Sequence, residues 1–209
     1  MSADPDLLAT WTRGWALTRG APAPVRDGLG WRIDVGQPDQ IVRYIHADAD
    51  ETVRRRAAAI REPFVFLKIC ADAEAVRPLL DDRWVLPPPG FMMTLSASMG
   101  AAETAPAGYR LDIEPGPVAF VRFLDTEGEE AARGRVTVVD GRIIFDRIAT
   151  APAHRRRGLA SRLMRVLEAI GRERGGREGV LVATEAGRAL YGRLGWRLHA
   201  PYTTAVIAD

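Results

Sequence analysis

The chain has 209 residues, of which 47% are apolar and 27% charged, the balance expected of a soluble globular protein. This length suffices for one large domain or two small ones. The formal net charge is only +2, which argues against a surface built mainly to bind polyanions. Cys70 is the only cysteine, so an intrachain disulfide and a cysteine-based metal cluster are excluded.

The chain carries no sign of export or of membrane insertion. Its first residues are acidic and lack an apolar core, so we expect no signal peptide. No stretch is long and apolar enough to span a membrane. His46 and His199 are isolated and lack metal-ligand spacing, so no metal is expected. We therefore expect a cytoplasmic protein without a metal.

The N-terminal half is predicted to alternate helices and strands. A helix is expected over residues 6–19, where apolar residues recur at helical spacing. Further strands are expected over 31–35, 41–46, 64–69 and 91–95, and further helices over 51–60 and 73–80. Asp50 and Asp72 are placed to cap the last two helices.

Two segments of the chain share one order of elements. Residues 66–94 are predicted to form a strand, an Asp-capped helix, Trp84 and a strand. Residues 180–207 are predicted to form a strand, a helix, Trp196 and a strand. Either the first segment is a degenerate copy of the second, or a common strand-helix-strand unit occurs twice by chance. We leave both interpretations open.

The middle of the chain is predicted to be a meander of strands. Residues 96–108 are rich in small residues, lack periodicity and are predicted to be a linker. Strands are expected over 109–113, 118–124, 132–139 and 142–150. Asp140-Gly141 is a strong two-residue hairpin signal between the last two.

A basic turn follows the last of these strands. Residues 155–160 read Arg-Arg-Arg-Gly-Leu-Ala, and an amphipathic helix continues to Arg174 before Gly175 ends it. The start of such a helix presents free backbone N–H groups and the positive end of the helix dipole, which favours a phosphate ligand. Gly158 has no Cβ to obstruct a pyrophosphate.

The turn resembles a known ligand-binding loop. Arg155-x-x-Gly158-x-Ala160, between a strand and a helix, is similar to the acyl-CoA pyrophosphate loop of the GCN5-related N-acetyltransferase (GNAT) superfamily. Residues 190–196, Leu-Tyr-x-x-Leu-Gly-Trp, resemble the family's second signature. These segments cover about the last third of the chain, and the preceding strands extend the likeness to near Tyr109.

The resemblance implies a fold and a domain organisation. It implies an α/β (α+β) N-acyltransferase fold, a mixed and mostly antiparallel sheet flanked by helices. We expect an N-terminal α/β region over 1–95, which is a degenerate GNAT-like half-domain on the first interpretation above, a linker over 96–108 and an acetyl-CoA-binding domain over 109–209. Only 114–117 separate the first two strands of that domain, so the family's usual pair of helices is missing there. The N-terminal half is expected to supply that wall of the acceptor site instead.

The resemblance also implies a reaction and its binding residues. The reaction is acetyl transfer from acetyl-CoA, a co-substrate, to a primary amine by direct attack. The implied CoA-binding residues are Ile148, Ala149, Thr150, Arg155, Arg156, Arg157, Gly158, Leu159, Ala160 and Thr184. Thr184 stands where many relatives carry Asn, so one polar atom of the usual side chain is lost.

Two residues are candidates for proton transfer. Tyr191 resembles the family tyrosine that protonates the CoA sulfur, and packing in the core is the structural alternative. Asp146 is the candidate general base, and an ion pair is its structural alternative. Asp112, Glu114 or a chain of water molecules are other routes for the proton. His154 is expected to support the loop.

Other functions stay open at this point. A catalytically inactive CoA-binding or regulatory module would carry the same loop. A nucleic-acid contact by the arginines would show steeply salt-dependent binding, but the low net charge argues against it. We expect a small-molecule or peptide amine as acceptor and no nucleic-acid or membrane partner, and we leave a homodimer open.

Overall fold

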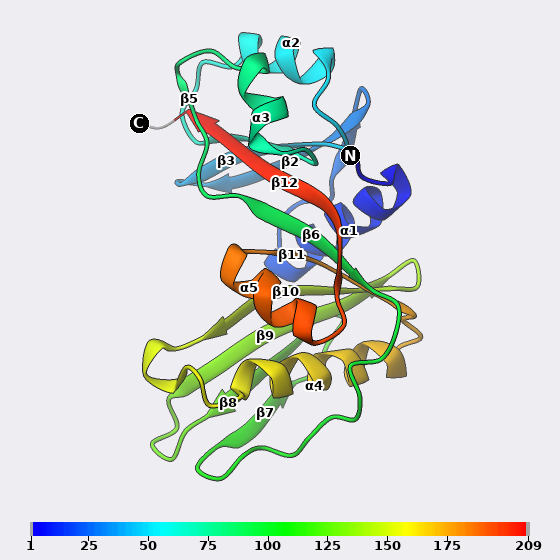
Figure 1. Cartoon of the computed structure of the whole chain (residues 1–209), viewed down its shortest axis with the longest axis vertical. Coiled ribbons are helices and arrows are strands. Elements are labelled where there is room, and N and C mark those ends of the chain that lie inside the picture. Colours follow the sequence, from blue (N-terminus) through cyan, green and yellow to red (C-terminus); the bar gives the residue numbers. More distant parts are fainter. Residues whose placement is uncertain (1, 208–209) are drawn as a thin grey trace. The chain divides into compact units, whose positions relative to one another are not determined.

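The structure is a computed structural model that describes residues 2–207 (Figure 1). The chain forms two compact units. The N-terminal unit contains residues 2–93, 182–189 and 198–207, and the central unit contains residues 94–181 and 190–197. This division cuts across the expected 109–209 domain, because the last strand of the chain pairs inside the N-terminal unit.

The N-terminal unit is a mixed sheet with three helices. Its elements are α1 (Pro5–Arg19), β1 (Val25–Asp27), β2 (Gly30–Gln37), β3 (Gln40–His46), α2 (Glu51–Ala59), β4 (Val65–Ile69), α3 (Ala73–Val76), the 3₁₀ turn η1 (Arg77–Leu79), β5 (Trp84–Val85) and most of β12 (Arg197–Ile207). The strands follow the order β1-β2-β3-β4-β12, with β5 also on β12. Only β3 and β4 are parallel. β1 and β5 are short strands that the sequence did not predict.

Aspartates begin all three helices of this unit. Oδ1 of Asp4 accepts from two backbone N–H groups of α1, and Oδ1 of Asp50 does the same for α2. Asp72 caps α3, as predicted. The prediction of one helix over 73–80 was wrong, because α3 stops at Val76 and continues as a 3₁₀ turn. Pro78 lacks the N–H group that an α-helix needs there.

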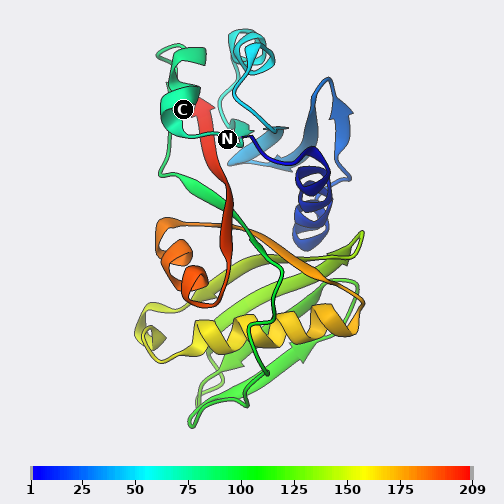
Figure 2. The same cartoon turned by 45° about the vertical axis from the view of Figure 1, so that its right-hand side comes forward.

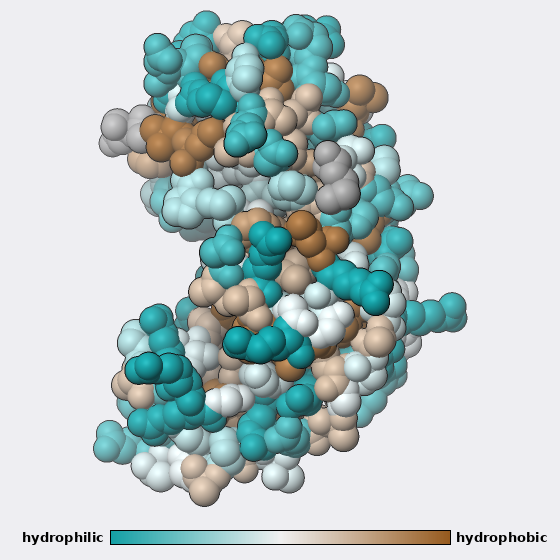
Figure 3. Space-filling view, viewed as in Figure 1, coloured by the Kyte–Doolittle hydropathy of each residue, from teal (hydrophilic) through white to brown (hydrophobic). Residues whose placement is uncertain are grey.

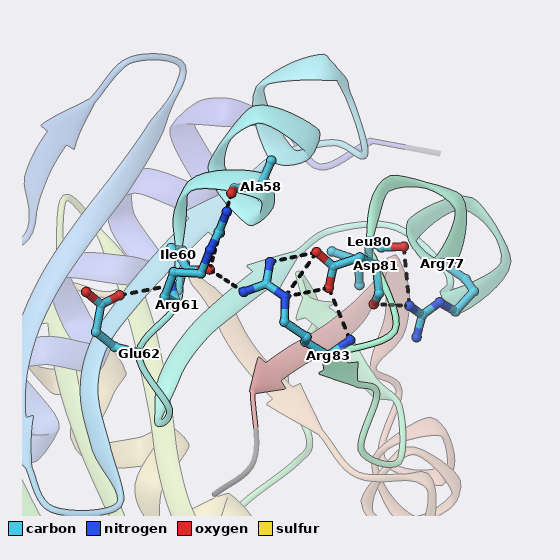
Figure 4. A network of polar contacts seen from close by, with 8 residues as sticks. All are labelled: Ala58, Ile60, Arg61, Glu62, Arg77, Leu80, Asp81 and Arg83. Carbon is cyan, nitrogen blue, oxygen red and sulfur yellow. Dashed lines mark hydrogen bonds and ion pairs between the residues drawn. The ribbon is translucent and has the colours of Figure 1, made fainter.

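A polar network fixes the chain after that turn (Figure 4). Arg83 binds both carboxylate oxygens of Asp81 and also donates to the Ile60 carbonyl at 3.0 Å. Arg77 donates to the carbonyls of Asp81 and Trp84 at 2.6 and 2.9 Å. Because the Arg83–Asp81 ion pair is largely exposed, we expect it to contribute little to stability on its own. The network chiefly satisfies backbone carbonyls at the end of α2 and around η1.

The central unit is a meander that continues into a parallel strand. Its elements are β7 (Arg110–Glu114), β8 (Ala119–Leu124), β9 (Glu130–Val139), β10 (Arg142–Thr150), η2 (Pro152–His154) and α4 (Leu159–Glu173). Four elements contribute residues to both units: β6 (Gly90–Leu95), β11 (Glu178–Ala183), α5 (Glu185–Arg193) and β12, through Arg197. β7 to β10 pair in antiparallel succession, and β11 joins β10 in parallel. The predicted mixed, mostly antiparallel sheet is confirmed.

Asp140 and Gly141 form the predicted two-residue hairpin. Both residues have positive φ, 47° and 72°, as a type I′ turn requires. Four residues, 115–118, connect β7 to β8, so the pair of helices expected of the family is absent there.

α4 lies along one face of the meander in both Figure 1 and Figure 2. Its buried side chains include Leu159, Leu163, Met164, Val166 and Leu167. Glycines permit the close approach. A Cβ on Gly171 of α4 would lie 2.3 Å from Cγ2 of Ile143, and one on Gly134 of β9 would lie 2.7 Å from Cδ1 of Leu167.

Residues 96–108, the predicted linker, form no helix or strand but are fastened to α4. The backbone N–H of Met99 donates to buried Glu168 at 2.8 Å, and its carbonyl accepts from Arg165 at 3.0 Å. Glu103 forms ion pairs with Arg162 and Arg165. Figure 2 shows the segment crossing α4. It therefore belongs to the central unit.

The two units share an order of elements. In one, β3, α2 and β4 form a parallel strand pair joined by a helix, and α3 follows. In the other, β10, α4 and β11 do the same, and α5 follows. The likeness seen in the sequence thus extends upstream by one strand and one helix.

Hydrophilic residues cover most of the face seen in Figure 3, and strongly hydrophobic areas on it are small. In the part of the chain that the structure describes, no helix has the length and apolar character needed to cross a membrane.

Candidate functional site

The N-terminus of α4 differs from those of α1 to α3. Its N-cap is Gly158, which has no side chain, and no described side chain caps the helix. The N–H groups of the first turn, at Leu159, Ala160 and Ser161, therefore lack the carboxylate that begins each earlier helix. Together with the helix dipole, these N–H groups favour an anion.

A cavity of about 340 Å³ opens at this helix start. It is lined by Thr150, His154, Arg155, Arg156, Gly158, Leu159, Ala160, Ser161, Leu190 and Arg193. Three of these side chains are guanidinium groups, and none is a carboxylate. The cavity therefore combines fixed positive charge with backbone donors, a combination suited to phosphate groups.

The loop before α4 has an unusual backbone. Arg156 and Gly158 both have positive φ, 62° and 76°. Glycine adopts this region freely, whereas arginine does so rarely. A Cβ at Gly158 would meet no atom within 4 Å, so its backbone faces open space. Arg155 is held by a long hydrogen bond of 3.4 Å from its Nε to the Thr150 carbonyl.

The predicted arginines divide into two groups. Arg155 and Arg156 line the cavity. Arg157 does not; its Nη1 donates to the Tyr109 hydroxyl oxygen at 3.0 Å. The structure therefore brings two of the three predicted arginines to the candidate site and turns the third toward the start of β7.

Strand β10 carries the residues predicted to contact pantetheine. β10 pairs with β11 in parallel over three residues, Arg142–Ile144 with Glu178–Val180. Within the central unit this pairing does not continue to Phe145 and Leu181. A bulge lies between Asp146 and Ala149, and Arg147 has a φ of 54°. Thr150 lines the cavity, whereas Ile148 and Ala149 do not.

Tyr191 is buried, with 7% of its surface exposed. Its ring packs 6.1 Å from that of Trp196, which also contacts Phe145 edge to face. Burial raises the pKa of Tyr191 to about 12. The phenol thus stays protonated at neutral pH, as a proton donor must. Tyr191 does not line the cavity, although its helix neighbour Leu190 does.

The candidate general bases lie elsewhere on the strands. Asp146 is half-buried at the bulge of β10 and does not line the cavity. The bulge interrupts the regular alternation of side chains between Asp146 and Ala149. Asp112 accepts from Nε and Nη2 of Arg122 at 2.9 and 2.6 Å, so it serves as an ion-pair partner. Glu114 is exposed at the end of β7.

Thr184 caps α5. Its hydroxyl accepts from the Gly187 N–H at 3.2 Å, and its carbonyl accepts from the Arg188 N–H at 2.8 Å. These two bonds give partners to backbone N–H groups in the first turn of α5. A direct contact of Thr184 with CoA stays a prediction.

Sequence reasoning missed three cavity residues, Ser161, Leu190 and Arg193. Ser161 could have been found, because it occupies the third position of α4, next to the loop. Leu190 and Arg193 are one helical turn apart on α5, and no local signal shows that this turn faces the α4 loop.

The corresponding helix of the N-terminal unit has no comparable site. α2 follows β3 as α4 follows β10, but Asp50 places its own carboxylate on the first N–H groups. That carboxylate would repel a phosphate group there. Groups of acidic, His or Cys residues that could hold a metal are also absent from residues 2–207.

Comparisons with known proteins agree with this architecture. The Acetyltransferase (GNAT) family matches residues 78–196, more than half of the chain. No curated protein matches it in sequence. A GCN5-related N-acetyltransferase from Kribbella flavida is similar in structure, with a TM-score of 0.67 and 14% identity over 100% of this chain and 97% of the other. For a GNAT-family protein from Novosphingobium aromaticivorans the values are 0.63 and 17%, over 99% of each chain.

A tandem GNAT protein from the clavulanic acid biosynthesis pathway is also similar. Its TM-score is 0.58 at 13% identity, over 97% of this chain and 92% of the other. At these identities the solved structures establish the fold, and the family match covers the loop, α4 and the segment through Trp196. The chain belongs to the GNAT acetyltransferase family.

Proposed function

We propose that the protein transfers an acetyl group from acetyl-CoA to a primary amine. One observation carries the proposal: the uncapped start of α4 opens on a cavity lined by Arg155, Arg156 and Arg193. A pyrophosphate bound there would accept hydrogen bonds from backbone N–H groups and from the guanidinium groups. Family membership supports acetyl transfer in general, and acetyl-CoA with an amine acceptor is the specific form that we propose.

In this proposal β10 guides the rest of the donor toward the reaction centre. The backbone of Ile148, Ala149 and Thr150 would contact pantetheine beyond the short ladder with β11. A backbone N–H on this stretch would stabilise the oxyanion that forms when the amine attacks the thioester. Arg157 is proposed to hold the loop rather than the ligand, since its side chain turns to Tyr109.

Three proton transfers complete the reaction, the third being loss of the proton that the attacking nitrogen still carries as the amide forms, which the Tyr191 phenolate left after thiolate protonation would take up. The amine must be neutral to attack, and a primary alkyl amine with a pKa of about 10.4 is mostly protonated at pH 7. Asp146 or water molecules would accept that proton. The leaving thiolate would take a proton from Tyr191, whose raised pKa keeps the phenol in its donor form. No covalent enzyme intermediate is involved.

We also propose that the N-terminal unit is a degenerate copy that does not bind CoA. Its β3-α2-β4 arrangement repeats that of β10-α4-β11, while Asp50 occupies the helix start. The structural likeness to a tandem GNAT protein over 97% of this chain supports this proposal. A cytoplasmic location and a homodimer stay predictions.

The test is turnover of acetyl-CoA with a panel of amines, followed by release of the CoA thiol. The panel contains small diamines, amino acids and a peptide with a free N-terminus, each paired with its tertiary-amine analogue. Thiol release that depends on a primary amine, with the acetylated amine identified by mass, is the expected result. Binding of acetyl-CoA without turnover of any panel member would favour the alternative, a CoA-binding regulatory module.

A further inference from the structure

A chain of polar contacts holds Arg157 outside the cavity. The Tyr109 hydroxyl oxygen accepts from Arg157 Nη1 at 3.0 Å and lies 3.0 Å from Nδ1 of His154. Nε2 of His154 lies 3.5 Å from Oδ2 of Asp125. The rings of Tyr109 and His154 also meet edge to face, with centroids 5.6 Å apart. These four residues come from the start of β7, the β8–β9 turn and the loop before α4.

The chemistry of these groups fixes which atom donates and which accepts in each of these polar contacts. A guanidinium only donates, so the Tyr109 oxygen accepts from Arg157 and its own proton is available to Nδ1 of His154. A carboxylate only accepts, so it favours the His154 tautomer with the proton on Nε2. Donors and acceptors are thus matched from Arg157 to His154, and Nε2 of His154 faces the Asp125 carboxylate at 3.5 Å.

Asp125, the last residue in this series of polar contacts, lies in a tight turn. Oδ1 of Asp125 accepts from the backbone N–H groups of Glu127 and Glu129, both at 3.0 Å. The side chains of Asp125 and His154 are each only 18% exposed, which limits competition from water. The contacts therefore connect the loop to a turn that is fixed by its own backbone.

The loop needs such support because its backbone is strained. Arg156 has a φ of 62°, which residues other than glycine rarely adopt and which persists only where the surroundings impose it. Arg155 is fastened on one side, by the bond from its Nε to the Thr150 carbonyl, and Arg157 on the other, by Tyr109. The two anchors flank the strained residue.

We propose that Tyr109 and His154 are positioning residues that hold the 155–158 loop in the conformation that presents the start of α4 to the pyrophosphate of acyl-CoA. The inference rests on the proposed function. A loop that is ordered before the ligand arrives loses less conformational freedom on binding. Neither residue needs to touch the reacting atoms.

The first test compares Tyr109→Phe with Tyr202→Phe. Both changes remove only a hydroxyl, but the buried Tyr202 hydroxyl has no hydrogen-bond partner among the described residues. Two quantities are measured: amide hydrogen exchange of residues 154–160 in the ligand-free protein, and the Kd for CoA and for pantetheine, which lacks the pyrophosphate. Both measurements use the full chain.

Tyr109→Phe is expected to speed loop exchange and to raise the Kd for CoA about tenfold, while the Kd for pantetheine changes less than twofold. Tyr202→Phe is expected to change none of these. An equal loss of affinity for CoA and for pantetheine in Tyr109→Phe would overturn the proposal, because the effect would then not act through the pyrophosphate loop.

A second variant, Asp125→Asn, keeps the Oδ1 acceptor of the turn. Its amide can donate to His154 Nε2, which moves the ring proton to Nδ1, where it competes with Arg157 for the Tyr109 oxygen. Asp125→Asn is also expected to speed loop exchange and to raise the Kd for CoA, but by less than Tyr109→Phe. Loop exchange that is unchanged in both variants would contradict the positioning role. A wild type that binds no CoA would contradict the proposed function instead.

Discussion

Tyr191 combines a packing role with the proton-donor role proposed for it. Its ring contacts Trp196, so Tyr191→Phe should keep the fold and leave the melting temperature nearly unchanged. Loss of the Tyr191 hydroxyl, the proposed proton donor, should lower kcat about 100-fold, within the range typical of a general acid. Steady-state kinetics with an amine identified in the panel checks this. A kcat within twofold of wild type would assign Tyr191 to packing alone.

Lys68, the only lysine of the chain, lies almost fully buried on β4. Its Nζ donates to Thr204 Oγ1 at 2.7 Å. Burial, and then the charges of Arg43 and Arg19, lower its pKa from 10.5 to about 6. Between these pH values the unfolded chain binds a proton that the folded chain does not. The stability contributed by this group is therefore complete above pH 10.5 and is lost as the pH falls toward 6.

Lys68→Met removes this proton linkage while keeping a similar volume. At pH 7 the variant should be more stable than wild type by up to about 5 kcal/mol, and the gain should shrink toward zero as the pH rises above 10.5. Denaturant unfolding at several pH values measures it. A stability difference that does not vary with pH would show that Lys68 is charged in the folded protein.

For individual residues, the sequence predicted the loop but not the direction in which each side chain points. The basic turn, Gly158 and the start of the following helix indicated an anion site, because that signal is local. The turn of Arg157 toward Tyr109 depends on a residue 48 positions away, which no local pattern reveals.

The packing of α4 on the sheet depends on glycines. Gly171→Ala should destabilise the protein by about 1–3 kcal/mol, because the new Cβ would lie 2.3 Å from Ile143 Cγ2. The control is Gly192→Ala in α5, where nothing lies within 4 Å; it should be neutral or stabilise by up to about 1 kcal/mol. Thermal unfolding of both variants decides. Equal effects would mean that α4 does not sit this close to β10.

Strong periodicity and turn chemistry made most elements predictable. The helix after the loop, the strands of the meander and the Asp140-Gly141 hairpin were found where patterns were clear. The sequence analysis did not place the end of α3 at Val76, although Pro78, two residues later, lacks the N–H group that a continuing α-helix needs. The bulge in β10 and the fastening of Met99 to α4 depend on tertiary contacts.

For the whole molecule, the family and the fold class could be recognised from the sequence, but the pairing of the last strand could not. The expected 109–209 domain assumed that neighbouring segments stay together. β12 instead pairs with β4 in the N-terminal unit. Pairing between strands so far apart in the chain is set by the sheet as a whole and leaves no mark in local sequence.

Binding of acetyl-CoA at the start of α4 is the central claim, and melting temperature in the presence of acetyl-CoA tests it most directly. The comparison uses Ala160→Glu and Ala160→Gln. Ala160 lines the cavity in the first turn of α4, so a carboxylate there suits the helix dipole and should not harm the fold, yet it would repel a phosphate.

Wild type and the Gln variant should melt several degrees higher with acetyl-CoA, since a ligand at 100 times its Kd stabilises the folded state by about 2.7 kcal/mol. The Glu variant should show almost no rise, although its melting temperature without ligand matches or exceeds that of wild type. No rise in wild type, or an equal rise in the Glu variant, would contradict binding at this helix start.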